Sequence, residues 1–215
     1  MIRRFRLLIL AGVHGQEPQS SFILDAISKD FTLVDKEPYQ VFSFTEKDFE
    51  ICSIPRFNEY GLLNNIRGNK SKVDLNRNLP SQNWSKDFSH PDYNPGPKAE
   101  SEVETQKLVS LIRSFEPNLI LSIHTNHFVT EQNPPQVNFD GEFESDGYNL
   151  AQKLSKLIDL ELTCDIGYST PGSLGSYAKD LKIPCITLEL DDNLDNQASL
   201  DRYGKALERF LFRDF

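Results

Sequence analysis

Short apolar runs alternate with amphipathic segments along the chain. Residues 5–11 form a continuous apolar run, which is typical of a strand buried on both faces. From about Pro18 to Lys29 the apolar residues fall on one helical face, and Pro18 suits the first turn of a helix. Residues 39–45 and 51–54 predict two further strands, because β-branched and aromatic residues gather there.

The second half of the chain repeats this alternation. Residues 98–115 predict a helix whose apolar side chains fall on one stripe and which ends before Pro117. We expect five more elements, namely strands at 119–124, 161–166 and 185–190 and helices at 146–158 and 200–211. Strands that alternate with helices predict an α/β fold, a three-layer α/β/α sandwich around a mixed, largely parallel sheet.

Residues 58–97 show little periodicity and are rich in Asn, Gly, Pro and Ser. A structureless connection of this length is uncommon inside a compact domain unless it has a function. We therefore expect a long ordered loop or a binding segment here.

Chain length and composition narrow the function classes. The 215 residues suit one compact domain, residues 1–215. The net charge of -9 is spread along the chain, and no dense Lys/Arg patch with stacking aromatics occurs, so we do not expect a nucleic-acid partner. Three widely spaced cysteines argue against a disulfide framework and favour a reducing compartment.

The N-terminus superficially resembles a signal peptide, because basic residues precede an apolar stretch. That stretch, Leu7 to Val13, has only seven residues, and nothing approaches the length of a membrane span. We interpret it as the first strand of a cytoplasmic protein with no membrane partner. The sequence does not predict the oligomeric state.

Three candidate site residues lie at or just after the ends of predicted strands. They are His14, His124 and Glu189, and Glu17 follows His14 by three residues. Because ligands bind beyond the carboxyl ends of the strands in such sheets, we expect these side chains to converge. Two imidazoles and one carboxylate, with a fourth position left to water, form a catalytic zinc set, and Glu189 is the candidate general base.

The segment Lys72 to Pro80 adds a candidate substrate clamp. Arg77 presents a planar fork of donors that matches a carboxylate, and Asn76 and Asn78 can add amide hydrogen bonds. Upstream, Arg67 is a candidate for polarising a carbonyl and stabilising an oxyanion.

Each motif also has a simpler interpretation. A lone His-x-x-Glu at a strand-to-helix junction is more often an ordinary turn, in which Glu17 favours the positive end of the helix. Asn-Arg-Asn by itself is a plausible turn, and Glu189 by itself could be a paired carboxylate at a strand end. Neither interpretation explains why both features occur with His124 at a strand terminus.

Taken in order, the motifs are His-x-x-Glu, Asp-x-Asn-Arg-Asn, Ser-Ile-His and Thr-x-Glu-Leu, and they extend from His14 to Glu189. This order resembles the zinc carboxypeptidase A-like family. The resemblance implies that His14, Glu17 and His124 bind one zinc ion per chain and that Glu189 is the general base. It also implies that Asn76 and Arg77 bind the substrate carboxylate. Arg67 would assist the carbonyl, and Tyr168 would close over the ligand.

Residues 73–80 with Asn83 and Trp84, and residues 167–190, are similar to the murein peptide amidase branch of this family. This resemblance implies a small peptide substrate, the murein tripeptide L-Ala-γ-D-Glu-meso-diaminopimelate, cleaved at its γ-D-glutamyl-meso-diaminopimelate bond during peptidoglycan recycling. Leu174 lies in the stretch that lines the pocket for the leaving residue, but its apolar side chain does not indicate how a zwitterionic group is bound.

Two other functions remain open from the sequence. A zinc deacylase of the aspartoacylase or succinylglutamate desuccinylase type shares His-x-x-Glu and Asp-Leu-Asn-Arg, and a non-catalytic zinc or murein-peptide binding module would need no carboxylate at Glu189. The residues Thr170 to Ala178 and the second Asn after Arg77 favour the peptidase. Tyr177 and His127 both lie near the predicted site. The pattern favours packing for Tyr177 and no role for His127, although His127 is close enough to His124 in sequence to reach the site, and the sequence leaves both possibilities open.

Overall fold

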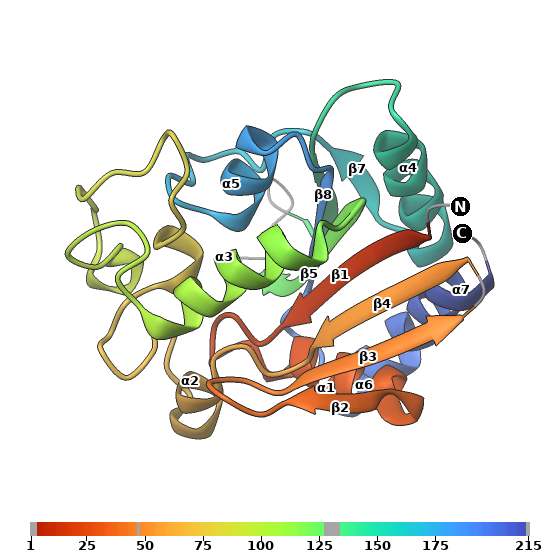
Figure 1. The fold of residues 1–215 in the computed structure, drawn as a ribbon. Coiled ribbons are helices and arrows are strands. Elements are labelled where there is room, and N and C mark those ends of the chain that lie inside the picture. Colours follow the sequence, from red (N-terminus) through yellow and green to blue (C-terminus); the bar gives the residue numbers. More distant parts are fainter. Residues whose placement is uncertain (1–3, 47, 127–133, 214–215) are drawn as a thin grey trace.

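The computed structural model of the chain describes residues 4–46, 48–126 and 134–213. Its centre is one eight-stranded sheet in the order β2-β3-β4-β1-β5-β8-β6-β7 (Figure 1). The strands are β1 Phe5–Ala11, β2 Thr32–Asp35, β3 Val41–Glu46, β4 Phe49–Ile54, β5 Leu119–Asn126, β6 Gln136–Asp140, β7 Glu161–Thr163 and β8 Cys185–Asp191. The central strands β4, β1, β5 and β8 are mutually parallel, whereas β3 pairs antiparallel with β2 and β4, and β6 with β8.

Helices cover both faces of this sheet and complete the three-layer sandwich. They are α1 Pro18–Ile27, α2 Glu59–Asn64, α3 Val103–Phe115, α4 Asp146–Ile158, α5 Leu174–Asp180, α6 Asn196–Ser199 and α7 Lys205–Arg213, with single turns η1 Ser28–Asp30, η2 Leu75–Arg77, η3 Pro91–Tyr93 and η4 Leu200–Gly204. In Figure 1, α3 crosses in front of the strands, and α1, α6 and α7 lie behind them. Within the described residues no helix is both long and apolar enough to cross a membrane.

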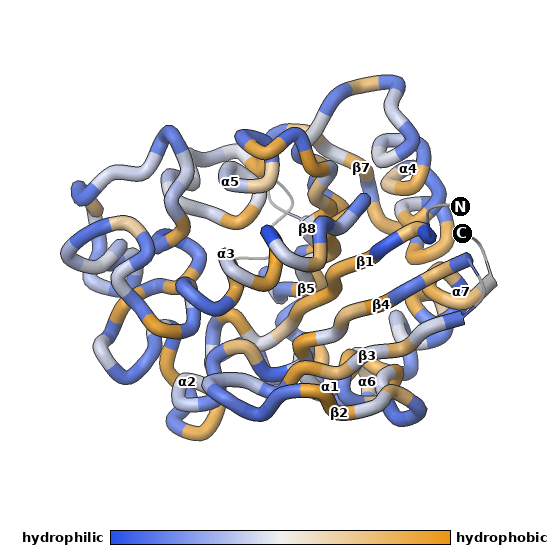
Figure 2. The backbone as a smooth tube through the Cα atoms, viewed as in Figure 1, coloured by the Kyte–Doolittle hydropathy of each residue, from blue (hydrophilic) through white to orange (hydrophobic). Residues whose placement is uncertain are grey.

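The apolar run of β1 separates two hydrophobic clusters. Leu7 and Ile9 contact the cluster that includes residues of α1, α4 and α7, whereas Leu8 and Leu10 contact the cluster that includes residues of α3 and α5. All four side chains are fully buried. A strand covered on both faces needs apolar residues at successive positions, which is why the run is continuous rather than alternating. Figure 2 shows these hydrophobic central strands.

The parallel register brings distant parts of the chain to one edge of the sheet. Ala11 at the end of β1 lies opposite Ile123 of β5, and the next residue of β5, His124, lies opposite Glu189 of β8. The carboxyl ends of these three strands therefore meet, although they are more than 170 residues apart at the extremes.

The fold differs from the sequence-based expectation at four places. The strands β2 and β6 were not expected, and α2 lies within the segment that was expected to be a loop. The third helix begins at Val103 rather than at Lys98, because residues 98–102 instead fold around the side chain of Asn78. Asn78 Nδ2 donates to the carbonyl oxygen of Lys98, and the backbone N–H of Glu102 donates to Asn78 Oδ1.

The first prediction concerns the core beneath the site. Leu121 in β5 is fully buried, so Leu121→Ala removes apolar contacts and leaves a cavity. We expect the free energy of unfolding to fall by about 2–5 kcal/mol in urea titrations. Leu63→Ala is the matched control, because that side chain is 77% exposed, and it should change stability by about 0.5 kcal/mol or less. Equal effects of the two substitutions would contradict the assigned core.

Candidate active site

A tight turn after β1 positions His14. Gly12 adopts a left-handed backbone conformation with φ of 66°. Gly15 packs so closely on the backbone of Gly61 that a Cβ atom at position 15 would collide with it. The backbone N–H of Gly15 also donates to the carbonyl oxygen of Ile66 at 3.0 Å. The glycines therefore hold the turn against α2 and point His14 along the edge of the sheet.

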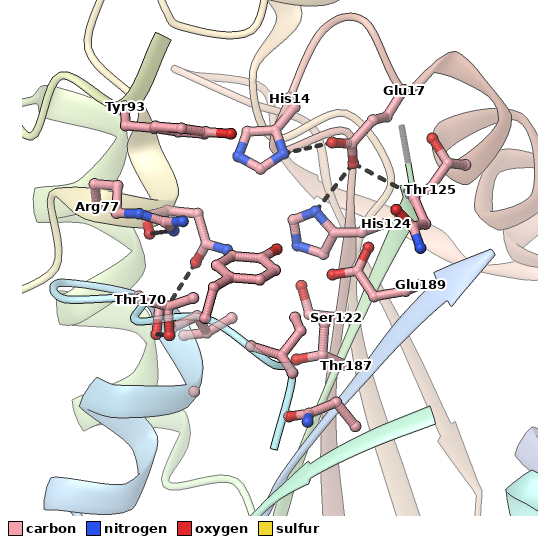
Figure 3. Close-up of a pocket in the computed structure, with 18 of the residues that line it drawn as sticks. His14, Glu17, Arg77, Tyr93, Ser122, His124, Thr125, Thr170, Thr187 and Glu189 are labelled. Atoms are coloured by element: carbon pink, nitrogen blue, oxygen red, sulfur yellow. Dashed lines mark hydrogen bonds and ion pairs between the residues drawn. The ribbon is translucent and has the colours of Figure 1, made fainter. Parts of the chain in front are cut away.

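His14, Glu17 and His124 form a buried cluster at this edge, shown in Figure 3. Glu17 Oε1 lies 2.6 Å from His14 Nδ1, and Glu17 Oε2 lies 3.0 Å from His124 Nδ1. Each residue offers one ligand atom, and these atoms all lie within 4.8 Å of one another. All three side chains are 4% exposed or less, so the cluster is shielded from bulk water.

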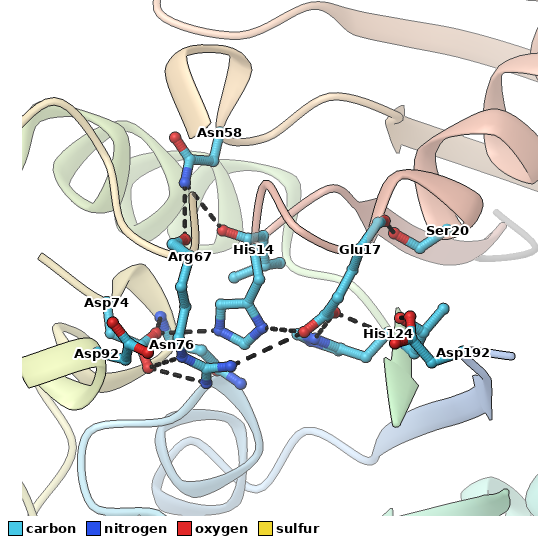
Figure 4. Close-up of polar contacts among 12 residues, drawn as sticks. His14, Glu17, Ser20, Asn58, Arg67, Asp74, Asn76, Asp92, His124 and Asp192 are labelled. Carbon is cyan, nitrogen blue, oxygen red and sulfur yellow. Dashed lines mark hydrogen bonds and ion pairs between the residues drawn. The ribbon is translucent and has the colours of Figure 1, made fainter. Parts of the chain in front are cut away.

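Asp74 and Arg67 form a second layer around the cluster (Figure 4). Asp74 Oδ1 lies 3.0 Å from His14 Nε2, and Arg67 donates from Nε to Asp74 Oδ2 at 2.9 Å. Arg67 Nη1 also lies 3.9 Å from Glu17 Oε1. Burial alone would raise the pKa of Asp74, but Arg67 and His14 outweigh it and hold that pKa below its ordinary value.

The donor set fits a divalent cation. An ionised Asp74 only accepts hydrogen bonds, so His14 Nε2 must carry a proton toward it, and His14 Nδ1 then faces Glu17 at 2.6 Å. Two acceptors at that distance repel unless a proton or a cation lies between them. Burial and Arg67 lower the pKa of His14, but Glu17 and Asp74 raise it by more, so the pKa lies above its ordinary value. Without a metal, the site therefore favours a proton between His14 and Glu17. A cation held by His14, Glu17 and His124 would replace that proton.

Glu189 lies beside this cluster on β8, directly opposite His124. Burial raises the pKa of Glu189 to about 7, with Glu17 adding to the increase and His124, Arg67 and Arg77 opposing it. A carboxyl group with a pKa near neutrality is suited to accept a proton and to return it. Without the opposing effects of His124, Arg67 and Arg77, the pKa of Glu189 would be higher.

A cavity of about 560 Å³ opens over these residues. Its volume is in the range of sites that enclose small ligands. Arg77 lines the cavity and is 6% exposed, with Nη1 donating to the carbonyl oxygen of Asn76 at 2.7 Å. The guanidinium groups of Arg67 and Arg77 lie 5.1 and 5.6 Å from the ring centre of Tyr93. Two cations thus face the cavity from the same segment of chain.

The side chain of Asn78 does not face this cavity, and the expectation that it adds a hydrogen bond to the substrate is wrong. Asn78 is fully buried. Its amide nitrogen donates to Pro95, Lys98 and Ser101, and its oxygen accepts from Glu102. All its capacity to donate is used within the protein, so it orders the loop that follows instead.

The two stretches that carry the closest family resemblance pack against each other. The backbone N–H of Leu174 donates to Asn76 Oδ1 at 2.9 Å, and that of Gly172 donates to Asn83 Oδ1 at 3.2 Å. A Cβ atom at Gly172 would collide with the carbonyl of Arg77. Because Asn76 accepts with its oxygen, its amide nitrogen is left to donate toward a ligand.

The remaining candidates lie at different depths. Tyr168 lines the mouth of the cavity and is 55% exposed, whereas Tyr177 is 3% exposed and packs in the core. His127 lies outside the described residues. Asp74 had no predicted role, although it opens the Asp-x-Asn-Arg-Asn motif, because nothing local in the sequence shows that it contacts His14.

The chain is similar in sequence to several known proteins. A family model described as zinc carboxypeptidase matches residues 56–198, which include His124 and Glu189 but not His14 and Glu17. Murein peptide amidase A of Escherichia coli K12 is 31% identical over 215 residues, covering 95% of this chain and 78% of the relative. Murein peptide amidase A of Vibrio campbellii is 31% identical over 196 residues, covering 86% and 69%.

Solved structures share the fold. Murein-tripeptide amidase from Escherichia coli O157 superposes with a TM-score of 0.74 at 26% identity, covering 98% of this chain and 82% of that chain. The tripeptide-bound cell shape determinant Csd4 from Helicobacter pylori superposes with a TM-score of 0.66 at 18% identity, covering 97% and 50%. At that identity the second likeness concerns the fold alone.

The second prediction tests the layer around the cluster. Asp74→Asn removes the carboxylate that pairs with the buried Arg67 at 2.9 Å and leaves only the longer contact with Glu17 at 3.9 Å, so we expect the free energy of unfolding to fall by about 3–5 kcal/mol. Denaturant titrations in a chelator measure this without a contribution from bound metal. Because folding lowers the pKa of Asp74, its stabilisation is present above pH ~4 and is lost as the pH falls below that value.

The matched control for this variant is Asp35→Asn, which removes the exposed ion pair between Asp35 and Lys107. Solvent screens that pair, so stability should change little. A loss in Asp74→Asn no greater than in Asp35→Asn would show that the buried pair is not needed for folding.

Proposed function

Because this chain belongs to the zinc carboxypeptidase family, we propose that it is a zinc-dependent peptidase that hydrolyses the γ-D-glutamyl-meso-diaminopimelate bond of the murein tripeptide L-Ala-γ-D-Glu-meso-diaminopimelate. The observation that carries the proposal is the convergence of His14, Glu17 and His124 beside Glu189 at the wall of one cavity. The relatives named above support the choice of substrate, which we assign to peptidoglycan recycling.

In this proposal His14, Glu17 and His124 hold one zinc ion per chain. A zinc ion bound there would polarise a carbonyl oxygen and lower the pKa of a bound water toward ~7. The buried position of the three side chains and the contact of Asp74 with His14 favour a preorganised ligand set.

Glu189 is the general base and acid. It accepts a proton from the attacking water and then donates that proton to the amine of the leaving residue. The pKa near 7 suits both steps, since the carboxyl group changes protonation readily near neutral pH. Arg67, which lies beside Glu17, stabilises the negative charge that develops on the carbonyl oxygen.

Arg77 and Asn76 bind the carboxylate of the leaving residue. A guanidinium group that is 6% exposed at a cavity wall is expected to pair with an anion, because an unpaired buried charge is unfavourable. Tyr168, half-exposed at the cavity mouth, closes over the bound peptide.

We place the reaction in the cytoplasm. The support is that Cys52 and Cys185 are buried as free thiols and Cys164 is free at the surface, in keeping with a reducing compartment.

The third prediction tests the reaction itself. Incubation of the zinc-loaded protein with the murein tripeptide should release free meso-diaminopimelate, detected by mass spectrometry, and a chelator should abolish the release. An N-acylated aspartate and a succinylated glutamate are the control substrates for the deacylase alternative. Cleavage of these with no release of diaminopimelate would overturn the proposed function.

The fourth prediction separates the roles of ligand and base. Glu189→Gln should retain about one zinc ion per chain by metal analysis but lose turnover by about 10²-fold or more, because the proton acceptor is gone. His14→Ala should lose the metal as well as the activity, since one of three ligands is removed. Full zinc occupancy in His14→Ala, or normal turnover in Glu189→Gln, would reject the corresponding role.

A further inference from the structure

The ring of Tyr93 contacts both arginine side chains of the site. Its centre lies 5.1 Å from the guanidinium carbon of Arg67 and 5.6 Å from that of Arg77. A guanidinium group within about 6 Å of a ring centre is attracted by the partial negative charge on the ring face. In Figure 3 the ring of Tyr93 lies above the side chain of Arg77. One aromatic side chain therefore contacts the groups to which the proposed function assigns the carbonyl oxygen and the substrate carboxylate.

The two guanidinium groups differ in their other contacts. Arg67 pairs with Asp74 at 2.9 Å and approaches Glu17 at 3.9 Å. Arg77 Nη1 donates instead to the backbone carbonyl oxygen of the preceding residue at 2.7 Å. One hydrogen bond does not fix the plane of a guanidinium group, whereas stacking on the face of an aromatic ring can do so. We therefore expect the orientation of Arg77 to depend on Tyr93.

The backbone on either side of the Tyr93 ring is anchored to the segment that carries the arginines. Tyr93 ends the turn η3, and the next residue, Asn94, accepts a hydrogen bond from the backbone N–H of Asp74 at 2.8 Å. The side chain of Asn94 also donates to the carbonyl oxygen of Lys72 at 3.0 Å. One residue farther on, the backbone carbonyl oxygen accepts from Asn78 Nδ2 at 2.7 Å. These bonds give the ring a fixed position relative to both arginines.

Tyr93 also limits the access of water to the two cations. It lines the main cavity and a neighbouring cavity of about 450 Å³, together with Arg77 and Tyr168. The side chain of Arg67 is 13% exposed and Arg77 is 6% exposed. A cation from which water is largely excluded interacts more strongly with an anion than one in bulk water. The ring thus favours the binding of negative charge at both positions.

We propose that Tyr93 is a positioning residue that holds the guanidinium groups of Arg67 and Arg77 at a fixed separation. The inference rests on the proposed function, in which Arg67 stabilises the carbonyl oxygen and Arg77 binds the carboxylate of the leaving residue. The separation then sets how far that carboxylate lies from the bond that is cleaved. Tyr93 acts through the two arginines, and its ring rather than its hydroxyl group performs this role.

The fifth prediction compares Tyr93→Phe with Tyr93→Leu. Phenylalanine keeps the ring and loses the hydroxyl group, whereas leucine keeps an apolar side chain without a ring. With the murein tripeptide, kcat and KM of Tyr93→Phe should stay within about threefold of the wild type. Tyr93→Leu should lower kcat/KM by about 10-fold or more, with kcat reduced through Arg67 and KM raised through Arg77.

A second peptide separates positioning from a general loss of structure. In this peptide a carboxamide replaces the α-carboxylate of the leaving residue, next to the bond that is cleaved. The wild type should prefer the acid, and Tyr93→Leu should reduce the ratio of kcat/KM for the acid over the amide by about fivefold or more, because Arg77 is no longer held. Partial unfolding would lower both values equally and leave this ratio unchanged.

Phe88→Leu is the matched control. Phe88 lines the smaller cavity and is 51% exposed, so the same change from an aromatic ring to leucine is made beside the site. Its kcat, KM and acid-over-amide ratio should change by less than about twofold.

An unchanged acid-over-amide ratio in Tyr93→Leu, or a loss in Tyr93→Phe as large as in Tyr93→Leu, would refute the inference and leave the proposed function intact. Circular dichroism and thermal unfolding show whether each variant is folded. Tyr93→Met, which also lacks a ring, replaces Tyr93→Leu if the latter does not fold.

If the wild type cleaves neither peptide, the proposed function fails, and NMR of the arginine side chains decides the inference separately. The Nε–H signals of Arg67 and Arg77, assigned with Arg67→Lys and Arg77→Lys, should be shifted by the ring current of Tyr93. They should keep their positions in Tyr93→Phe and move toward those of free arginine in the variant without a ring. Signals that are the same with and without the ring reject the inference.

Discussion

The bridge formed by Glu17 between His14 and His124 is the interaction on which the site depends. A carboxylate that is 3% exposed is unfavourable unless positive or hydrogen-bonding groups surround it. Burial would raise the pKa of Glu17, but the two imidazoles hold it well below its ordinary value. The bridge therefore requires the end of β1 and the end of β5 to be neighbours, and their parallel pairing provides that arrangement.

Arg67 and Arg77 come to the site from a segment that lacks regular secondary structure over most of its length. Side-chain amides replace helix and sheet hydrogen bonds there. Asn69 Oδ1 accepts from the backbone of Val73, its Nδ2 donates to Glu102 Oε2, and Asn78 binds the loop that follows. Buried amides that use both donor and acceptor groups can order a loop as firmly as a backbone ladder. The segment can thus present Arg67 and Arg77 to the cavity.

Sequence patterns located most elements and missed others for identifiable reasons. The strand β1 and the helix α4 have the bounds that their apolar patterns predicted. The strand β6 reads Gln-Val-Asn-Phe-Asp, a strict alternation that indicates a half-buried strand, but it is only five residues long and follows two prolines. The strand β2 is exposed along its whole length, so no apolar pattern marks it. The start of α3 was placed too early, because a helix pattern cannot reveal that Asn78, 25 residues before Val103, binds the backbone of residues 98–102.

By itself the sequence determined the alternation of strands and helices, and it placed His14, His124 and Glu189 at strand ends, because hydrophobic periodicity is a local property that a short window reveals. Only the tertiary structure decided the strand order β1-β5-β8-β6 and therefore which side chains lie opposite one another. That order aligned Ser122 with Asn138 through Thr187, and the folding of the segment before α3 brought Asp74 to His14 and turned Asn78 inward. The physical reason is that strand pairing and the burial of side-chain amides depend on the free energy of contacts between residues far apart in the chain. A local sequence pattern does not reveal these contacts.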